Sequence, residues 1–256
     1  MSLLPMKQYA GIIALGVMAV AAAVFFREEA PAPQKPAAPS PQIKTGNNTQ
    51  TTSTAPVGTP TRTLPKSTDF DFYVLSLSWS PSYCASSEGA GNRQQCGTNR
   101  RYGFVVHGLW PQNENGYPQF CSSSEPERVP DALGRSMFDI MPSMGLIGHQ
   151  WRKHGSCSGL SQKDYFAATR AAFDAVKLPQ TISQGQNNQT ISADGLEKAF
   201  IAANPRMSQQ GISISCDGGR FEEVRICLTQ DLQFRSCQQV DRQGCQTKQM
   251  TIPPIR

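Results

Sequence analysis

Histidine is scarce in this sequence, and the short cysteine and histidine spacings of structural zinc sites are missing. Only three histidines occur among 256 residues, and no CxxC or HxxxH pair is present. Structural zinc sites are usually assembled from pairs at such spacings. We therefore expect neither a zinc-binding domain nor a metal or other cofactor.

Charged residues are also sparse. Lys, Arg, Asp and Glu make up 17% of the chain, and the formal net charge is +5. Residues 1–66 hold six basic and two acidic residues, whereas the remaining residues hold 18 basic and 17 acidic ones. Any attraction for a polyanion must therefore come from a local site rather than from a general positive field.

No cysteine precedes Cys84, and all eight lie between Cys84 and Cys245. An even number of cysteines in an exported chain indicates disulfide bonds. Eight cysteines allow 105 pairings, so spacing alone does not give the connectivity.

Export is indicated by an uncharged apolar run, Gly11–Phe26, that follows Lys7. Its sixteen residues are at the short end of the roughly 17–25 that span a bilayer. The triplets AVA and AAA within it resemble signal-peptidase sites. Residues 1–26 are thus either a cleaved signal peptide or an anchor that attaches the chain to a membrane through residues 9–26. Both alternatives place the cysteines outside the cytoplasm, in the periplasm or in secreted form.

Residues 27–66 are rich in Pro, Ala, Ser and Thr and contain few large apolar residues. Such a segment cannot bury enough surface to fold, so we predict a disordered linker. Residues 67–256 form the predicted folded domain. A strand is expected at residues 72–80, where Tyr73, Leu75, Leu77 and Trp79 alternate with smaller residues.

The rest of the domain mixes strands and helices, which indicates an α+β fold. We expect a short second strand that stops at Gly108 and a further strand at residues 221–228. Helices are expected at residues 161–176 and at residues 192–204, the latter capped by Ser192 and ending before Pro205.

All three histidines lie in two short segments. "FVVHGLWPQ" contains His107, and "GHQWRKHGSCSG" contains His149 and His154. We expect a helix over residues 148–155, on which, at 100° per residue, four side chains share a sector of roughly 140°: His149, Gln150, Lys153 and His154. Cations on one face repel one another unless an anion is nearby, and no acidic residue lies in that segment, so we expect a phosphate ligand.

Trp151 lies on the opposite face of this helix, where we expect it to pack in the core. Two other chemistries fit the residues less well. His149 and His154 are five residues apart, unlike the pair of an HExxH metal site. Cys157 belongs to the even set of cysteines, which argues against a cysteine-protease nucleophile.

Two histidines suit RNA cleavage by transesterification, because one removes the proton of the ribose 2′-OH while another protonates the departing 5′-oxygen. The two quoted segments resemble the active-site segments of the ribonuclease T2 family, over roughly residues 68–250. The resemblance implies an α+β fold with an antiparallel sheet flanked by helices. It also implies a metal-independent endoribonuclease of low base specificity that binds RNA and needs no obligate protein partner.

The resemblance further implies a role for each site residue. The catalytic roles are His107 as general acid, His154 as general base, and Lys153 with Gln150 as stabilisers of the phosphorane. The binding roles are His149 for phosphate, Trp110 for stacking on a base and Tyr117 as a weaker candidate for the same base. The implied disulfides are Cys84–Cys96, Cys121–Cys157, Cys216–Cys245 and Cys227–Cys237.

Gln150 departs from the family pattern, which usually has glutamate at this position. An amide forms a hydrogen bond with a phosphoryl oxygen, but it carries no charge and transfers no proton. The alternative function is therefore a catalytically weakened protein that only binds RNA or nucleotides. A metal-dependent hydrolase is a third reading, which sensitivity to EDTA would reveal.

Overall fold

The computed structural model describes residue 67 and residues 69–97, 101–184 and 187–255. The predicted signal peptide or anchor (1–26) and the predicted linker (27–66) lie outside the described residues. Within the described ranges, every helix is too short or too polar to span a bilayer.

The described domain is built on one six-stranded sheet. Its strand order is β2-β1-β5-β6-β3, and β4 also pairs with β5. Neighbouring strands are antiparallel, apart from a single parallel pair between β5 and β6. The strands are β1 (Phe72–Trp79), β2 (Phe104–Gln112), β3 (Gln189–Ile191), β4 (Ile212–Asp217), β5 (Arg220–Leu228) and β6 (Met250–Ile252).

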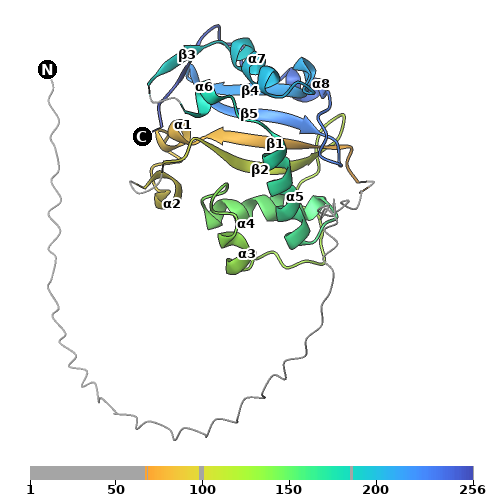
Figure 1. Cartoon of the computed structure of the whole chain (residues 1–256). Helices are drawn as coiled ribbons and strands as arrows, with labels where there is room; N and C mark the ends of the chain where they lie inside the picture. Colours follow the sequence, from red (N-terminus) through yellow and green to blue (C-terminus); the bar gives the residue numbers. More distant parts are fainter. Residues whose placement is uncertain (1–66, 68, 98–100, 185–186, 256) are drawn as a thin grey trace, which may run out of the picture. The chain divides into compact units, whose positions relative to one another are not determined.

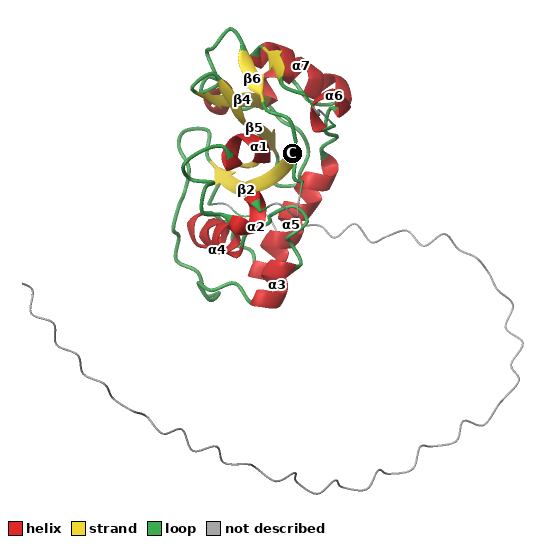
Figure 2. Cartoon of the chain, turned by 90° about the vertical axis from the view of Figure 1, so that its left-hand side faces the viewer, coloured by secondary structure: helices red, strands yellow, loops and turns green. Residues whose placement is uncertain are grey.

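Helices flank the sheet in two groups (Figure 1). The longer helices near β1 and β2 include α4 and α5, and α7 packs against β4. Figure 2 shows the same division from the side, with α3, α4 and α5 together and α6 and α7 at the other end. The α-helices are α1 (Ser80–Cys84), α2 (Arg93–Cys96), α3 (Asp131–Arg135), α4 (Met144–Lys153), α5 (Gln162–Ala175), α6 (Gln180–Ser183), α7 (Ala193–Ala203) and α8 (Gln238–Asp241). The prediction of an α+β fold with a largely antiparallel sheet is confirmed.

The two faces of β1 have different neighbours, as its alternating sequence predicts. The core-facing residues are Tyr73, Leu75, Leu77 and Trp79. Ser76 and Ser78 share the opposite face, where both hydroxyls donate hydrogen bonds to a carboxylate on β5. One strand therefore contributes to the hydrophobic core and to a polar site at the same time.

The prediction that the second strand stops at Gly108 is wrong, because β2 continues to Gln112. A β-bulge interrupts its alternation: the register with β1 passes from Ser76–Gly108 to Leu77–Val106. Val106 and Leu109, three residues apart, are both fully buried in the core. A bulge inserts one extra residue and changes the direction of the side chains around it. The alternation of buried and exposed residues is then broken, so a search for that alternation does not recognise the whole strand.

The two predicted helices are confirmed as α5 and α7. Ser161 and Ser192 each accept a hydrogen bond from a backbone N–H of the first helical turn, as N-cap residues do. The structure contains four disulfides, which are the pairs that the family resemblance implies: Cys84–Cys96, Cys121–Cys157, Cys216–Cys245 and Cys227–Cys237.

Candidate active site

His107 is the extra residue of the β-bulge in β2, between the paired residues Val106 and Gly108. Its side chain is 37% exposed and lines a cavity of about 870 Å³. Bulges are common beside active sites because they turn a side chain away from the regular direction of the strand. Here the bulge directs an imidazole into the cavity while the residues around it still reach the core.

The second histidine segment forms the end of α4. The helix stops at Lys153, and His154 has non-helical angles of φ −121° and ψ −47°. A Cβ on the next residue, Gly155, would lie 2.4 Å from Trp151 Cε3, so only glycine allows the chain to turn this tightly over the indole. The predicted helix through residue 155 is thus two residues too long, and His154 lies just beyond the end of α4.

The four polar side chains that we expected on one face of this helix differ in their exposure to solvent. Gln150 is 1% exposed and His154 is 5% exposed, whereas His149 is exposed and Lys153 is partly buried. Trp151 is fully buried and donates from Nε1 to the backbone oxygen of Pro126, so its predicted place in the core is confirmed.

Trp110 on β2 is the common neighbour of the site residues. Its Nε1 donates to Gln150 Oε1 at 2.8 Å. Its indole stacks on the His154 ring, with centroids 5.3 Å apart and planes at 28°. His107 meets the same indole edge-on at 5.3 Å, and the Arg225 guanidinium lies 5.6 Å from its centroid. The two imidazoles, 47 residues apart in sequence, therefore contact one side chain.

The orientation of the Gln150 amide follows from this contact. An indole N–H only donates, so Oε1 must face Trp110 and Nε2 remains a donor. No described residue accepts a hydrogen bond from Gln150 Nε2. The close approach needs Gly108, because a Cβ there would lie 2.1 Å from Gln150 Oε1.

His154 is held in its neutral form. Burial, the largest cause, and the positive charges of Lys153, His107 and His149 together lower the pKa of its imidazole to about 3. Its Nδ1 is buried and has no hydrogen-bond partner within the described residues. The pKa of His149 is also lowered, first by burial and then by Lys153 and Arg152.

Glu223 on β5 is the site residue that the sequence patterns did not identify. One of its carboxylate oxygens contacts His107 Nδ1 and accepts from Ser78 Oγ, and the other accepts from Ser76 and Arg225. Burial raises the pKa of this carboxyl, but these contacts outweigh burial and bring it to about 2. The only sequence signal is its place on the polar face of a strand, 116 residues from His107.

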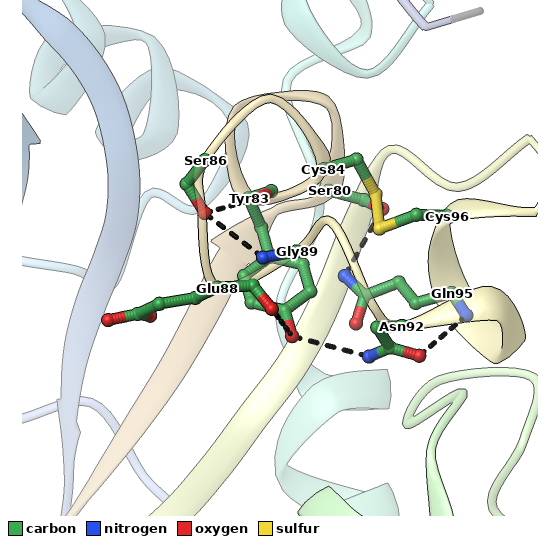
Figure 3. The surroundings of a disulfide bond; sticks show 9 residues. All are labelled: Ser80, Tyr83, Cys84, Ser86, Glu88, Gly89, Asn92, Gln95 and Cys96. Atoms are coloured by element: carbon green, nitrogen blue, oxygen red, sulfur yellow. Dashed lines mark hydrogen bonds between the residues drawn. A yellow bond between two sulfur atoms is a disulfide. The ribbon is translucent and has the colours of Figure 1, made fainter. Parts of the chain in front are cut away.

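The wall of the cavity opposite β5 comes from the α1–α2 hairpin, which the Cys84–Cys96 disulfide closes (Figure 3). Asn92 accepts from the backbone N–H of Gln95 and donates to the Tyr83 hydroxyl. Gln95, which is buried, donates to Ser80 Oγ. This network holds together polar side chains that line the same cavity as His107.

A second disulfide supports the end of α4. Cys121–Cys157 joins the loop after β2 to the turn after α4, and the backbone N–H of Phe120 donates to the Lys153 carbonyl at 2.9 Å. Tyr117 lies in the same loop, but it is 52% exposed. Within the described residues it shares no hydrogen bond or ring contact with the other predicted site residues.

No group of three or more His, Cys, Asp or Glu side chains in the described part of the chain is arranged to hold a metal ion. The site therefore consists of two imidazoles and a buried amide in contact with one tryptophan, together with a carboxylate that contacts His107 and a lysine whose charge acts on His154. Such a set moves protons and binds an anion.

Comparisons with known proteins identify the family. The sequence model of the ribonuclease T2 family matches residues 70–237. A probable ribonuclease of Haemophilus influenzae is 36% identical over 180 residues, which cover 66% of this chain and 61% of that protein. A ribonuclease of Aeromonas hydrophila is 46% identical over 97 residues, which cover 38% of this chain and 42% of that protein. The matched part thus spans less than two thirds of either relative.

A solved structure shares the fold. An RNase-related protein from Calystegia sepium superimposes with a TM-score of 0.59 at 21% identity, over 73% of this chain and 98% of that one. The family match covers both histidine segments and the strand that carries Glu223. This chain belongs to the ribonuclease T2 family.

Proposed function

We propose that this chain is a metal-independent endoribonuclease that cleaves single-stranded RNA with low base specificity. The reaction is a transesterification that gives 2′,3′-cyclic phosphates, followed by hydrolysis to 3′-phosphates. The main support is the pair of imidazoles that contact Trp110 in opposite electrostatic surroundings. His107 pairs with a carboxylate, whereas His154 is buried among positive charges.

In the first step, His154 is the general base, because burial keeps its imidazole neutral and able to accept a proton. It takes the proton of the ribose 2′-OH while that oxygen attacks phosphorus. His107 is the general acid: it gives a proton to the 5′-oxygen as the P–O5′ bond breaks. In the second step the roles reverse, as His107 accepts a proton from water and His154 returns one to the 2′-oxygen.

Lys153 and Gln150 stabilise the extra negative charge on the phosphorane. Lys153 contributes a full positive charge, and Gln150 Nε2 contributes a hydrogen-bond donor whose orientation Trp110 fixes. A fixed donor requires no reorganisation when the charge develops, which is why an amide still serves here without a charge.

His149 binds phosphate, since it is exposed and next to Lys153 along the same helix face. Trp110 stacks on a base and Tyr117 is a weaker candidate for the same base. Every base has a π-face, so stacking on aromatic rings discriminates little among bases. This accounts for the low base specificity that we propose.

The four disulfides favour an oxidising compartment, so we place the catalytic domain (67–256) in the periplasm or outside the cell. Residues 1–26 are the proposed export signal or membrane anchor, and residues 27–66 are the proposed linker. RNA is the proposed partner, and no obligate protein partner is required.

Digestion of RNA in a gel, with and without EDTA, tests the function. A cleared band that EDTA leaves intact is expected; a protein that only binds RNA gives none, and a metal hydrolase loses its band. The His154→Ala variant should lose the 2′,3′-cyclic ends that the wild type produces. Lys163→Ala, an exposed change on α5, is the control, and cyclic ends from both variants would contradict His154 as base.

A further inference from the structure

The Glu223 carboxylate is fully engaged by four donors. Oε1 contacts His107 Nδ1 and accepts from Ser78, and Oε2 accepts from Ser76 at 3.1 Å and from Arg225 at 3.4 Å. Its side chain is only 13% exposed. The strand register explains the arrangement, because Ser78 pairs directly with Glu223 and Ser76 pairs with Arg225 across β1 and β5. The position of this carboxylate is therefore set by the sheet itself.

This geometry fixes the tautomer of His107. A carboxylate only accepts hydrogen bonds, so the ring nitrogen in contact with it, Nδ1, carries a proton. The other ring nitrogen, Nε2, is left for a ligand in the cavity that His107 lines. A histidine that met a backbone N–H at Nδ1 would present the opposite pattern of protons.

We propose that Glu223 is a positioning residue for RNA cleavage: it holds the His107 ring with Nδ1 protonated and provides the counter-charge of its cationic form, so that Nε2 carries the proton for the 5′-oxygen. This inference rests on the proposed function. Glu223 does not touch the substrate and acts through His107 alone.

The charges around His107 explain why a carboxylate is needed there. Glu223 is the carboxylate in contact with the ring, and the cavity also contains the cations Arg220 and Arg225. Without Glu223, a protonated imidazole would lose its direct counter-charge. The titratable and charged side chains that line the cavity with His107 are Glu223, Glu222, Arg225 and Arg220 on β5, Asp217 on β4, Tyr83 and Glu88 near α1, and His149 on α4. His154 lies close enough for its charge to interact with that of His107, and Lys153 interacts with His154 in turn. The lowered pKa of Glu223, about 2, keeps this counter-charge present throughout the neutral range.

A merely structural role for Glu223 predicts different behaviour. The carboxylate would then satisfy the two serines and Arg225, and its loss would lower stability without altering proton transfer. The decisive variant is Glu223→Gln, because its amide oxygen still accepts from Nδ1 at the same place but carries no charge. Glu223→Asp keeps the charge on a shorter side chain.

The pH dependence of cleavage is the first measurement. In Glu223→Gln, the alkaline limb of the kcat profile should move to lower pH, since the cationic ring loses its counter-charge. The value of kcat should fall roughly 10- to 100-fold, a part of the ~10²–10⁴ that a whole acid–base group contributes, and KM should change little. Glu223→Asp keeps the charge, so its alkaline limb should lie between those of the wild type and Glu223→Gln. Glu127→Gln, the same change of charge at an exposed loop position, is the control.

The second measurement is ¹⁵N NMR of the histidine rings, which does not depend on activity. In the wild type, the neutral His107 ring should carry its proton on Nδ1. In Glu223→Gln the amide can present either its oxygen or its NH2 group to Nδ1, so the Nε2–H form should be populated as well. A wild-type ring with its proton on Nε2 overturns the proposal, whether or not the variants fold. So does a Glu223→Gln enzyme with an unchanged alkaline limb and kcat. If the wild type does not cleave RNA, the proposed function fails, but the tautomer still decides the role of Glu223.

Discussion

Replacing Gln150 by glutamate adds a negative charge beside Trp110 and His154 while the shape of the side chain is kept. In the wild type the amide oxygen accepts from the indole at 2.8 Å, and a carboxylate oxygen can accept the same bond. Burial and the positive charges of Lys153, His107 and His149 lower the pKa of His154 to about 3. The Gln150→Glu variant supplies the missing opposite charge.

The magnitude follows from the shared contact with the indole. An opposite charge within a few ångströms changes a pKa by about 1–3 units, so the His154 imidazole should titrate between about 4 and 6 in the variant. Gln150 is 1% exposed, and burial disfavours an ionised carboxyl, so the lower half of this interval is expected. The pKa of His149, which is exposed, should rise less. A base with a higher pKa accepts a proton more readily, so kcat near neutral pH should increase.

NMR titration of the histidine rings in the wild type and in Gln150→Glu measures both pKa values directly. The exposed Gln243→Glu variant is the control for the change in net charge. If the carboxyl in Gln150→Glu ionises below pH 6 and the His154 titration is nevertheless unchanged, the electrostatic reasoning is refuted. The reasoning would also be refuted if the acid limb of the profile of kcat/KM against pH lay at the same pH in the wild type and in Gln150→Glu.

Three further predictions concern the support of the site. A Cβ in Gly108→Ala would lie 2.1 Å from Gln150 Oε1, so we expect a loss of about 1–3 kcal/mol from overpacking and slower cleavage; urea unfolding and initial rates measure both, and wild-type values would contradict the close approach. Replacing Cys121 and Cys157 together by serine opens a loop of 36 residues, which should lower the free energy of unfolding by about 4 kcal/mol; equal urea midpoints would argue against this. The folded-state pKa of His154, about 3, is below its ordinary 6.5, so the unfolded chain binds more protons in this interval, and stability is lost as the pH falls from 6.5 toward 3. His154→Gln should flatten this part of the curve of Tm against pH, and an equally steep curve would contradict the assignment.

The local elements with a regular period could be predicted from the sequence. The alternation in β1 and the capped helices α5 and α7 appear in the structure with boundaries close to those expected. Each of these elements buries one regular stripe, and its caps are formed by nearby residues. The two histidine segments also lie together in the structure, since His107 and His154 both contact Trp110.

The remaining features depend on pairing between distant strands, which no local pattern contains. The continuation of β2 was missed because a bulge breaks the two-residue period at His107. Glu223 was missed because its contact with His107 exists only once β1 lies between β2 and β5. The end of α4 was placed too late because the close packing of Gly155 on Trp151 is a tertiary constraint.

The single extra residue in β2 has a consequence for anyone who transfers this site to another protein. On a strand without the bulge, the same sequence would turn over every side chain after His107, so that the Trp110 indole would enter the core and Leu109 would leave it. A graft that copies the motif letters onto a regular strand would therefore present the wrong ring to the cavity. The irregularity of the strand has to be transplanted together with its histidine.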